Sequence, residues 1–428
     1  MIVFLKKVRV KTIFSAFDPV VVEPLELCVL KSALNKINVE NYIIDDLFNL
    51  SEPSNIIPDA VVLTGYNVAE NEIKNEAWYY KSKFPHTKII VGGIHIQGNS
   101  LGFHSDKIDY VCKSGSLKSF KLLIENIIKN EQSSIDGVDY YDLRTKKWCI
   151  GNVETLHEKE YIAPDRSLFN EFSSKLRYME KSKVALIKGS IGCPYNCSYC
   201  YCKIINKGHY IKADYEKIIN EIETTDANAN YFWIVDDVLF AGRNDALEFI
   251  NIIKRRKIKV KIIGYLRADF ILKERDLLPK LKETGLCEII VGFEATSNEE
   301  LTDYNKNTNA LDYPNVISLL RENEIDLTAL FMVRPDYNFK DFKNLYKFIK
   351  NNKIDVYTIS ILTPIKGTSS YEMLKHQLTT KDPQKFDFLH LVLKPVLPKW
   401  VFYALFYGIQ INLLKSKRIW KFLLKLNS

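Results

Sequence analysis

The sequence predicts an α/β protein with two parallel-sheet domains and a helical C-terminal region. Short β-branched runs alternate with helical patterns in residues 1–135, and the same alternation returns in residues 182–373. Such alternation is typical of parallel sheets covered by helices. We expect the first domain to be doubly wound, or Rossmann-like. The second contains six β/α units, which predict a (β/α)6 partial TIM barrel or a full barrel.

In the first domain the turns after two expected strands contain glycine, at Thr64-Gly65-Tyr66 and Gly92-Gly93-Ile94-His95. Ligands of doubly wound sheets bind beyond the carboxyl ends of the strands, where these turns lie. The expected strands are residues 8–14, 39–44, 60–63 and 88–91, and the expected helices are residues 23–35 and 70–83.

Residues 136–181 are rich in polar clusters and predict a connector or a small hairpin. Residues 374–428 predict a helical region that caps the barrel and shapes a substrate pocket. Between them lies the barrel. Its expected strands are residues 182–189, 231–235, 261–265, 288–293, 326–331 and 356–361, and helices are expected at residues 215–223 and 245–256.

Composition excludes several classes of protein. The chain of 428 residues is 46% hydrophobic and 26% charged, which excludes a disordered or fibrous chain. The net charge of +8 comes mainly from lysine, and no stretch interleaves basic and aromatic residues as a nucleic-acid face would. The N-terminus lacks the order of a signal peptide, and the cysteines are not spread like a disulfide framework. We therefore expect a cytoplasmic protein that does not bind nucleic acid.

The C-terminal region contains an apolar run over residues 400–414, followed by Lys415, Lys417 and Arg418. The run is shorter than the roughly 20 residues that a membrane-spanning helix needs. Two interpretations stay open: a buried helix of the fold, and an in-plane helix that makes peripheral contact with a membrane through its basic flank.

Four cysteines lie within ten residues, and Cys193, Cys197 and Cys200 follow an expected strand in a C-x3-C-x2-C arrangement. Three thiolates on one loop can bind three corners of a cubane iron–sulfur cluster and leave the fourth iron open. A structural zinc site would need four ligands, usually from two CxxC pairs, and no second pair exists. Cys202 as a fourth ligand would be cramped. Structural zinc and unligated packing cysteines remain the alternatives.

This motif, with Tyr199 before the third cysteine, resembles that of the radical S-adenosylmethionine superfamily. The resemblance implies a [4Fe-4S] cluster whose open iron chelates S-adenosylmethionine. It also implies that an electron from the cluster cleaves this cofactor to a 5′-deoxyadenosyl radical. An electron donor such as flavodoxin or ferredoxin and anaerobic conditions would be needed. The protein would supply orientation and exclusion of water and oxygen.

Further segments match the superfamily by position and imply cofactor-facing residues at Asp236, Asp237, Arg267 and Glu294. Glu294 ends a segment that resembles the Gly-Ile-Glu-Ser pattern of the fifth strand. Structural roles are the alternatives, namely a helix N-cap for the aspartates and a surface ion pair of Arg267 with Asp269. No catalytic residue can be assigned from the sequence.

The first domain resembles the cobalamin-binding class of this superfamily, through a Gly-Gly-x-His match at Gly92, Gly93 and His95. The resemblance implies cobalamin binding by these residues. Two departures exist: the sequence contains no Asp-x-His-x-x-Gly, and residues 114–116 are Ser-Gly-Ser where acidic residues are usual. A remnant domain without the cofactor is the alternative.

With both cofactors, the resemblance implies methylation of an unactivated carbon of a small-molecule substrate. A lipid or another hydrophobic molecule is favoured by the apolar tail, and a peptide or secondary metabolite is the rival. A cyclase or oxidoreductase without methyl transfer is the second reading. An iron–sulfur sensor or a degenerate scaffold is the non-enzyme reading.

Overall fold

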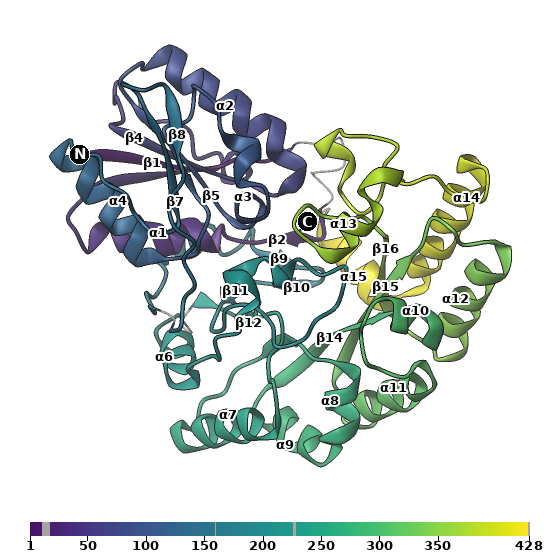
Figure 1. Ribbon diagram of the computed structural model, residues 1–428. Helices are drawn as coiled ribbons and strands as arrows, with labels where there is room; N and C mark the ends of the chain where they lie inside the picture. The colour runs from purple at the N-terminus through teal and green to yellow at the C-terminus, as the bar shows by residue number, and fades with distance from the viewer. Residues whose placement is uncertain (11–17, 159, 226–227, 427–428) are drawn as a thin grey trace.

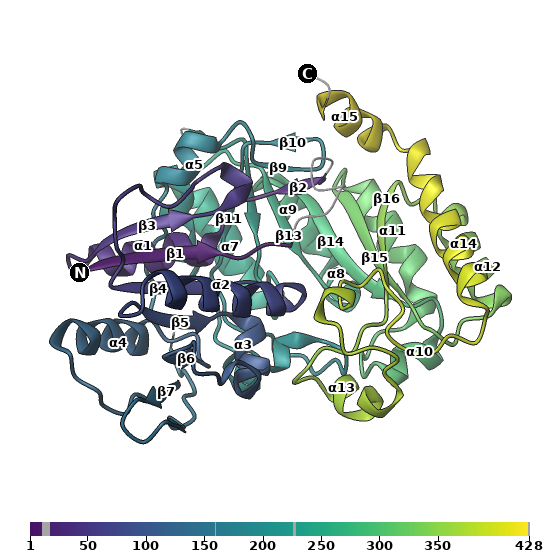
Figure 2. The same ribbon diagram turned by 90° about the horizontal axis from the view of Figure 1, so that it is seen from above.

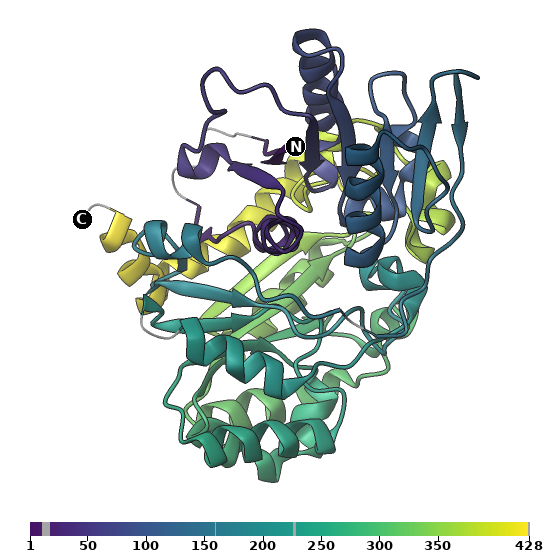
Figure 3. The same ribbon diagram turned by 90° about the vertical axis from the view of Figure 1, so that its left-hand side faces the viewer.

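The computed structural model describes residues 1–10, 18–158, 160–225 and 228–426. It contains two large sheets, each in its own domain, and a small three-stranded sheet (Figure 1). Figure 3 shows the N-terminal domain, purple to blue, stacked against the second domain, teal to green.

The N-terminal sheet has the strand order β3-β1-β4-β5-β6-β7-β8. Its first five strands in this order are parallel, and the β7–β8 hairpin, which falls in the expected connector, adds to the sheet in antiparallel fashion. The strands are β1 (Ile2–Lys7), β3 (Glu40–Ile44), β4 (Ala60–Thr64), β5 (Lys88–Gly92), β6 (Tyr110–Cys112), β7 (Val138–Asp142) and β8 (Lys147–Cys149).

The expected first strand at residues 8–14 is wrong, because the strand is Ile2–Lys7. This segment lies between β3 and β4 and pairs with both, so the consecutive residues Val3, Phe4 and Leu5 are all buried. A strand buried on both faces shows no alternation in the sequence. Residues 11–14 of the expected strand lie outside the described residues.

Helices cover both faces of the N-terminal sheet, which confirms the doubly wound prediction. Helix α2 (Glu70–Lys83) packs on one face through Ile73 and Tyr80. Helices α1 (Leu25–Asn35) and α4 (Leu117–Lys129) pack on the other face through residues such as Leu34 and Leu123.

The second domain is a six-stranded parallel sheet whose strands follow one another in chain order. Among the described residues no pairing joins its first and last strands, so it is an open, partial barrel, as predicted. The strands are β11 (Val184–Ile187), β12 (Tyr231–Ile234), β13 (Ile262–Tyr265), β14 (Leu286–Glu294), β15 (Asp326–Val333) and β16 (Val356–Ile361). The helices between them include α6 (Tyr215–Thr225), α7 (Arg243–Arg256), α8 (Ala268–Lys273), α9 (Leu278–Glu283), α10 (Asn298–Asp303), α11 (Tyr313–Glu322) and α12 (Phe339–Asn351).

The small sheet consists of β2 (Val20–Val21), β9 (Arg177–Tyr178) and β10 (Lys181–Ser182). It covers the amino ends of the barrel strands. Tyr178 packs with Trp233 of β12, and Lys181 pairs with Glu288 near the start of β14 at 2.6 Å. The barrel is therefore closed at its amino end and carries its functional loops at the carboxyl ends of the strands, which we call the mouth.

Loops at the carboxyl ends of both sheets meet. Gly98, which ends α3 (Ile94–Gly98), lies against Ile204 and Lys366 of the barrel mouth. Lys366 Nζ also lies 3.2 Å from the carboxylate of Glu70 at the start of α2. The ligand-binding edges of the two sheets thus face the same region (Figure 2).

Helix α13 (Ser369–Leu374) leads from the barrel into the C-terminal region, which contains α14 (Lys399–Gln410), the 3-10 helix η12 (Ile411–Lys415) and α15 (Lys417–Leu426). Residues near α13 lie at the mouth, whereas α14 packs along the barrel flank, where Phe402 contacts Phe342 of α12. Helix α15 lies at the amino end of the barrel. No helix in the described part of the chain is long and apolar enough to cross a membrane.

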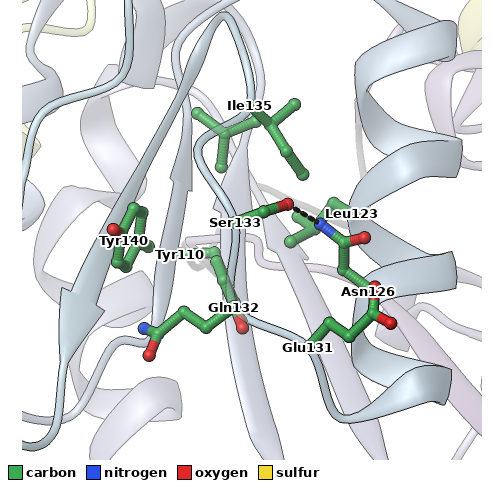
Figure 4. Close-up of a pocket in the computed structure, with 9 residues that line it drawn as sticks. Tyr110, Leu123, Asn126, Glu131, Gln132, Ser133, Ile135 and Tyr140 are labelled. Carbon is green, nitrogen blue, oxygen red and sulfur yellow. Dashed lines mark hydrogen bonds between the residues drawn. The ribbon is translucent and has the colours of Figure 1, made fainter.

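A small pocket lies away from the barrel, between α4, β6 and β7 (Figure 4). Tyr110, Leu123 and Tyr140 are among its lining residues, and its volume of about 10 Å³ suits a single water molecule. It plays no part in the site described next.

Candidate metal and cofactor site

Cys193, Cys197 and Cys200 lie on the loop between β11 and α6, at the barrel mouth. All three thiols are free and half-buried. Burial raises the pKa of Cys193 to about 11, and the nearby thiols of Cys200 and Cys197 add to this rise. The three thiols are therefore close enough to influence one another electrostatically.

The loop is held at its start by Asp236, which follows β12. Its two carboxylate oxygens accept hydrogen bonds from the backbone N–H groups of Gly189 and Ser190, at 2.7 and 2.8 Å. Asp236 is buried, with 1% of its surface exposed. Sequence reasoning expected Asp236 to face a cofactor, but in the structure both of its oxygens are engaged in positioning the cysteine loop.

The second half of the loop is held by the segment after α10. The backbone N–H of Ser198 donates to the carbonyl of Tyr304 at 2.9 Å. The side-chain amide of Asn305 donates to the carbonyl of Asn196 at 2.8 Å. Because these bonds flank Cys197, the loop keeps its shape through contacts from β12 and from the segment after α10.

The donor set fits a cubane cluster better than a single metal ion. Among the described residues, no three His, Cys, Asp or Glu side chains converge closely enough to hold one metal ion. Cubane thiolates each bind a different iron atom and need not converge on one point.

Glu294 ends β14 and faces Lys306 and Tyr199. Lys306 Nζ lies 3.2 Å from the Glu294 carboxylate and 3.3 Å from the Tyr199 hydroxyl. Glu294 has a positive φ of 65° at a break in the β14–β15 register. A non-glycine residue in this conformation costs about 1–3 kcal/mol, and such residues cluster at functional sites. Burial, and then the charge of Glu294, raise the pKa of Tyr199 well above its usual value.

Arg267, which follows β13, is buried beside the same group. Its guanidinium pairs with Asp269 at 2.9 Å and donates to the carbonyl of Lys306 at 2.6 Å. It also lies 3.8 Å from the ring centre of Tyr195, inside the cysteine loop. The ion pair with Asp269, which the sequence offered as a surface alternative, thus has a buried arginine, and a cation–π contact joins the same arginine to the loop.

Asp237 pairs with Lys188 at 3.3 Å. Burial alone would lower the pKa of Lys188, but Asp237 and Asp236 raise it above the usual value. The nearby thiol of Cys200, burial and the charge of Asp237 raise the pKa of Cys202. Sequence reasoning missed Lys188 and Tyr195. The position of Lys188, directly after β11, is the signal that could have indicated it, since polar residues at strand ends of such barrels are often functional.

A buried hydroxyl at the start of the cysteine loop has no partner. Ser190 is fully buried, and among the described residues its Oγ finds no hydrogen bond. Unpaired buried polar groups are rare in folded proteins. A polar group of a bound cofactor would satisfy it.

At the edge of the N-terminal sheet, Gly92 and Gly93 have different environments. Gly93 has a φ of 112°, and an added Cβ would lie 2.6 Å from Thr64 Oγ1. At Gly92 an added Cβ would meet only Cys112, at an ordinary 3.5 Å. The fold therefore requires glycine at Gly93 but not at Gly92.

His95 is buried, and its Nε2 lies 2.9 Å from the Glu70 carboxylate. Its ring also packs edge-on against Phe103. The Nε2 atom of His95 is thus engaged within the domain. Sequence reasoning missed Glu70, because nothing in the helical pattern of residues 70–83 distinguishes it.

The structure places the predicted residues in two groups. The cysteines, Tyr199, Asp236, Asp237, Arg267 and Glu294 share the barrel mouth, and Gly92, Gly93 and His95 share the facing edge of the N-terminal sheet. The contacts of Lys366 with Glu70 and of Gly98 with Ile204 bring these groups together across the domain boundary. The arrangement can hold a metal cluster beside a second ligand.

Comparison with known proteins gives a family match. Residues 187–349 match the profile of the radical SAM superfamily. This range contains the cysteine loop, the four barrel strands β12, β13, β14 and β15, and the last residue of β11.

Two curated relatives are similar over about half of the chain. The hopanoid C-3 methylase of Methylococcus capsulatus is 27% identical over 220 residues, 51% of this chain and 42% of the relative. The anaerobic magnesium-protoporphyrin IX monomethyl ester cyclase of Cereibacter sphaeroides is 26% identical over 246 residues, 56% of this chain and 40% of the relative. The chain thus spans about two fifths of the length of these relatives.

Among the solved structures that match both domains, we describe one. The cobalamin-dependent S-adenosylmethionine radical enzyme OxsB, with aqua-cobalamin and S-adenosylmethionine bound, superposes with a TM-score of 0.72. The match covers 92% of this chain and 64% of that chain, at 15% identity. At this identity the likeness is one of fold.

Proposed function

Because residues 187–349 form a radical SAM domain, we propose that the chain is a radical S-adenosylmethionine enzyme. Cys193, Cys197 and Cys200 hold a [4Fe-4S] cluster and leave one iron open for S-adenosylmethionine. The observation that carries this proposal is the three-cysteine loop, held at the barrel mouth by Asp236 and Asn305.

Around that loop, Glu294, Tyr199 and Arg267 bind and orient S-adenosylmethionine. Glu294 lies in a strained conformation at the end of a barrel strand, where catalytic groups of such barrels are found. Its carboxylate suits an amino group, and the ammonium of Lys306 suits a carboxylate. Asp236 and Asp237 act on the loop, through the backbone of Gly189 and through Lys188 and Cys202.

The N-terminal domain holds cobalamin at the sheet edge that faces the mouth. Gly92 supports this, because the fold itself does not require glycine there and an open backbone lets a large ligand approach. Since His95 Nε2 lies within hydrogen-bond distance of the Glu70 carboxylate, His95 would orient the Gly-Gly turn.

Methylation of an unactivated carbon is the reaction that these cofactors support best. When bound, they supply a 5′-deoxyadenosyl radical and a methyl group. The chain's own residues bind both cofactors on facing edges and exclude water between them. The similarity to a methylase supports this reaction.

A cyclase or oxidoreductase without methyl transfer is the second candidate. The similarity to a cyclase over 56% of the chain favours it. The products separate the two candidates when the methyl group of S-adenosylmethionine carries an isotopic label. A methylase transfers the labelled methyl group to its substrate, and a cyclase does not.

The substrate is a small molecule of hydrophobic character, and a flavodoxin or ferredoxin supplies the electron. Peripheral contact with a membrane through the C-terminal helices belongs to the same proposal. It is supported by the apolar, basic composition of residues 399–425.

Anaerobic reconstitution tests the proposed function. The protein is loaded with iron and sulfide and supplied with cobalamin, S-adenosylmethionine and dithionite. Formation of 5′-deoxyadenosine, together with the absorbance and electron paramagnetic spectra of a [4Fe-4S] cluster, is expected. A cluster without 5′-deoxyadenosine would indicate a sensor, and zinc in place of iron would overturn the proposal.

A further inference from the structure

The outer surface of α14 and η12 is an uninterrupted apolar stripe. Its exposed residues recur at helical spacing and are uncharged between the exposed lysines Lys399 and Lys415 at its two ends, and Trp400 and Ile411 are 76% and 63% exposed. They are Trp400, Ala404, Tyr407, Gly408, Ile411 and Leu414. Scattered exposed apolar residues need no explanation, but a contiguous stripe of this kind marks an interaction site.

Helix α15 continues this surface with a mixed pattern. Its exposed residues alternate lysine with large apolar residues in the order Lys417, Trp420, Lys421, Leu424 and Lys425. The opposite side of the helix is packed on the protein, and Phe422 is buried there. Tryptophan and leucine between lysines on one helix are typical of helices that lie in a membrane interface.

The stripe cannot turn inward, because both helices are anchored by their inner sides. Phe402, Phe406 and Ile409 of α14 are buried, and the Tyr357 hydroxyl donates to the carbonyl of Ile409 at 2.6 Å. Arg418 of α15 forms ion pairs with Glu288 at 2.8 Å and with Glu180 at 2.6 Å. The outer residues are therefore presented on a preformed scaffold.

The charge of this region has one sign. The sequence contains no Asp or Glu from Phe388 to Ser428. Its basic residues there are Lys394, Lys399, Lys415, Lys417, Arg418, Lys421 and Lys425. Among the described residues, Lys399, Lys415, Lys417 and Lys421 form no ion pair, so their charges are available to an anionic surface.

We propose that the outer side of α14, η12 and α15 is a docking surface for membranes that contain anionic lipids. We call it the outer C-terminal face; it consists of Lys399, Trp400, Tyr407, Ile411, Leu414, Lys415, Lys417, Trp420, Lys421 and Leu424. Apolar side chains enter the acyl boundary and the lysines meet lipid phosphates. The proposal deepens the membrane contact of the proposed function, but its test does not depend on catalysis.

Two other occupants fit the face less well. A second copy of the chain would bring the same lysines together and create like-charge repulsion. A nucleic acid would meet the lysines but would leave the apolar stripe of α14 without a partner. Lipid headgroups over acyl chains complement both kinds of residue.

The geometry also orients the barrel on the membrane. Val396, just before α14, donates its backbone N–H to the carbonyl of Pro335 after β15, at the mouth. Ser416, just before α15, bonds Asp355 before β16, at the amino end. The docked side is therefore a flank of the barrel that reaches from the mouth to the amino end, and α14 and α15 follow one outer edge of the molecule (Figure 2).

Flotation of the full chain with lipid vesicles tests the proposal. Vesicles of phosphatidylcholine with phosphatidylglycerol are compared with vesicles of phosphatidylcholine alone. We expect binding to the anionic vesicles at least about tenfold stronger, with a loss of binding at high salt. Acyl chains that carry bromine should quench the fluorescence of Trp400 and Trp420, and the quenching should be lost in the Trp400→Ser/Trp420→Ser variant.

Matched variants separate the face from general stickiness. Trp400→Ser/Ile411→Ser/Trp420→Ser and Lys417→Glu/Lys421→Glu should each weaken binding about tenfold or more. The controls, Trp78→Ser/Leu122→Ser/Ile128→Ser and Lys118→Glu/Lys129→Glu, change exposed residues of α2 and α4 and should bind normally.

Failure of the wild-type chain to float with anionic vesicles would overturn the proposal. Equal losses in the control variants would do the same, as would a dimer that the apolar variant abolishes. Each face variant should keep the wild-type yield of 5′-deoxyadenosine in lipid-free solution. A loss of vesicle binding with normal 5′-deoxyadenosine formation therefore concerns the docking surface alone.

Discussion

Lys366 of the barrel and Glu70 of the N-terminal domain form an ion pair across the domain boundary, with Nζ 3.2 Å from Oε2. The same carboxylate accepts hydrogen bonds from Asn99 and meets His95, both on the segment after the Gly-Gly turn. One buried carboxylate thus ties the edge of one sheet to the mouth of the other.

Replacement of Glu70 by Gln should loosen this link. Burial opposes the charge of Glu70, but hydrogen bonds from His95 and Lys74 outweigh it and lower the pKa of the carboxyl well below its usual range. The ionised carboxylate therefore adds stability above its unfolded pKa of about 4.3, and this contribution is lost as pH falls below it. At pH 7 we expect Glu70→Gln to lower the free energy of unfolding by about 1–3 kcal/mol.

Urea denaturation at pH 7 and at acid pH measures this difference. The gap between wild type and Glu70→Gln should shrink as the pH falls through 4, provided both stay folded. Glu131→Gln, at an exposed position of the same domain with no ion pair among the described residues, is the control and should change little. A gap that widens toward acid pH would contradict the argument.

The three cysteines should each be essential for the cluster. Cys193→Ala, Cys197→Ala or Cys200→Ala removes one of only three protein ligands, so cluster assembly and 5′-deoxyadenosine formation should be abolished. Cys202→Ala should leave the iron content near normal, because Cys202 lies outside the C-x3-C-x2-C motif and its thiol is buried. Iron and sulfide analysis after anaerobic reconstitution measures both, and an indispensable Cys202 beside a dispensable Cys193 would refute the ligand assignment.

Glu294→Gln should weaken S-adenosylmethionine binding without loss of the cluster. A hydrogen bond to a charged group contributes about 1.5–3 kcal/mol, so we expect affinity to fall by at least about tenfold. Equilibrium binding to the oxidised protein measures affinity, and the absorbance of the cluster is the internal control. Glu299→Gln, on the exposed side of α10, is the matched variant and should bind normally.

Alanine at Gly93 should lower the stability of the protein, whereas alanine at Gly92 should weaken cobalamin binding. Gly93→Ala would place a Cβ against Thr64 Oγ1 at a φ of 112°, so it should destabilise the protein by about 1–3 kcal/mol. Gly92→Ala fits the fold but adds a methyl group to the proposed corrin surface. It should keep the stability and weaken cobalamin binding about tenfold, since overpacking costs about 1–3 kcal/mol.

Thermal unfolding and cobalamin titration separate the two variants. Normal cobalamin affinity of the Gly92→Ala protein would remove this residue from the binding surface. It would leave the iron–sulfur part of the proposed function untouched.

The sequence was sufficient to predict the elements whose residues carry a local signal. Helix α2 has the expected bounds of Glu70 to Lys83, and β16 has those of Val356 to Ile361. The first strand was misplaced, because two apolar runs stand side by side and only pairing with β3 and β4 selects Ile2–Lys7. The β7–β8 hairpin was expected only as an option, and its addition to the N-terminal sheet depends on long-range pairing with β6.

The candidate site also has a part that a local motif predicts and a part that depends on long-range contacts. The cysteine motif is local and was predicted, whereas the partners that hold it are distant in the sequence. Asn305 and Asn196 are 109 residues apart, and Lys366 and Glu70 are 296 residues apart. Asp236 was chosen for its strand-end position, but only the fold shows that its oxygens face the backbone of Gly189 and Ser190.

Arg418 should be the anchor on which α15 depends. Its guanidinium bonds both oxygens of Glu288 at 2.9 and 2.8 Å, and Glu288 is fully buried at the amino end of the barrel. Removing one partner of a buried pair leaves an uncompensated charge, so Arg418→Met should lower the free energy of unfolding by about 3 kcal/mol. Lys181 also pairs with Glu288 and keeps the loss from being larger.

Lys421→Met, one turn along on the exposed side, is the control and should change the free energy of unfolding by less than about 0.5 kcal/mol. Urea denaturation measures the stability, and faster tryptic cleavage within α15 should accompany the loss. If Arg418→Met kept both the wild-type midpoint and the wild-type cleavage rate, the ion pair would not hold the helix, and the outer C-terminal face would have to be ordered by Phe422 and its neighbours alone.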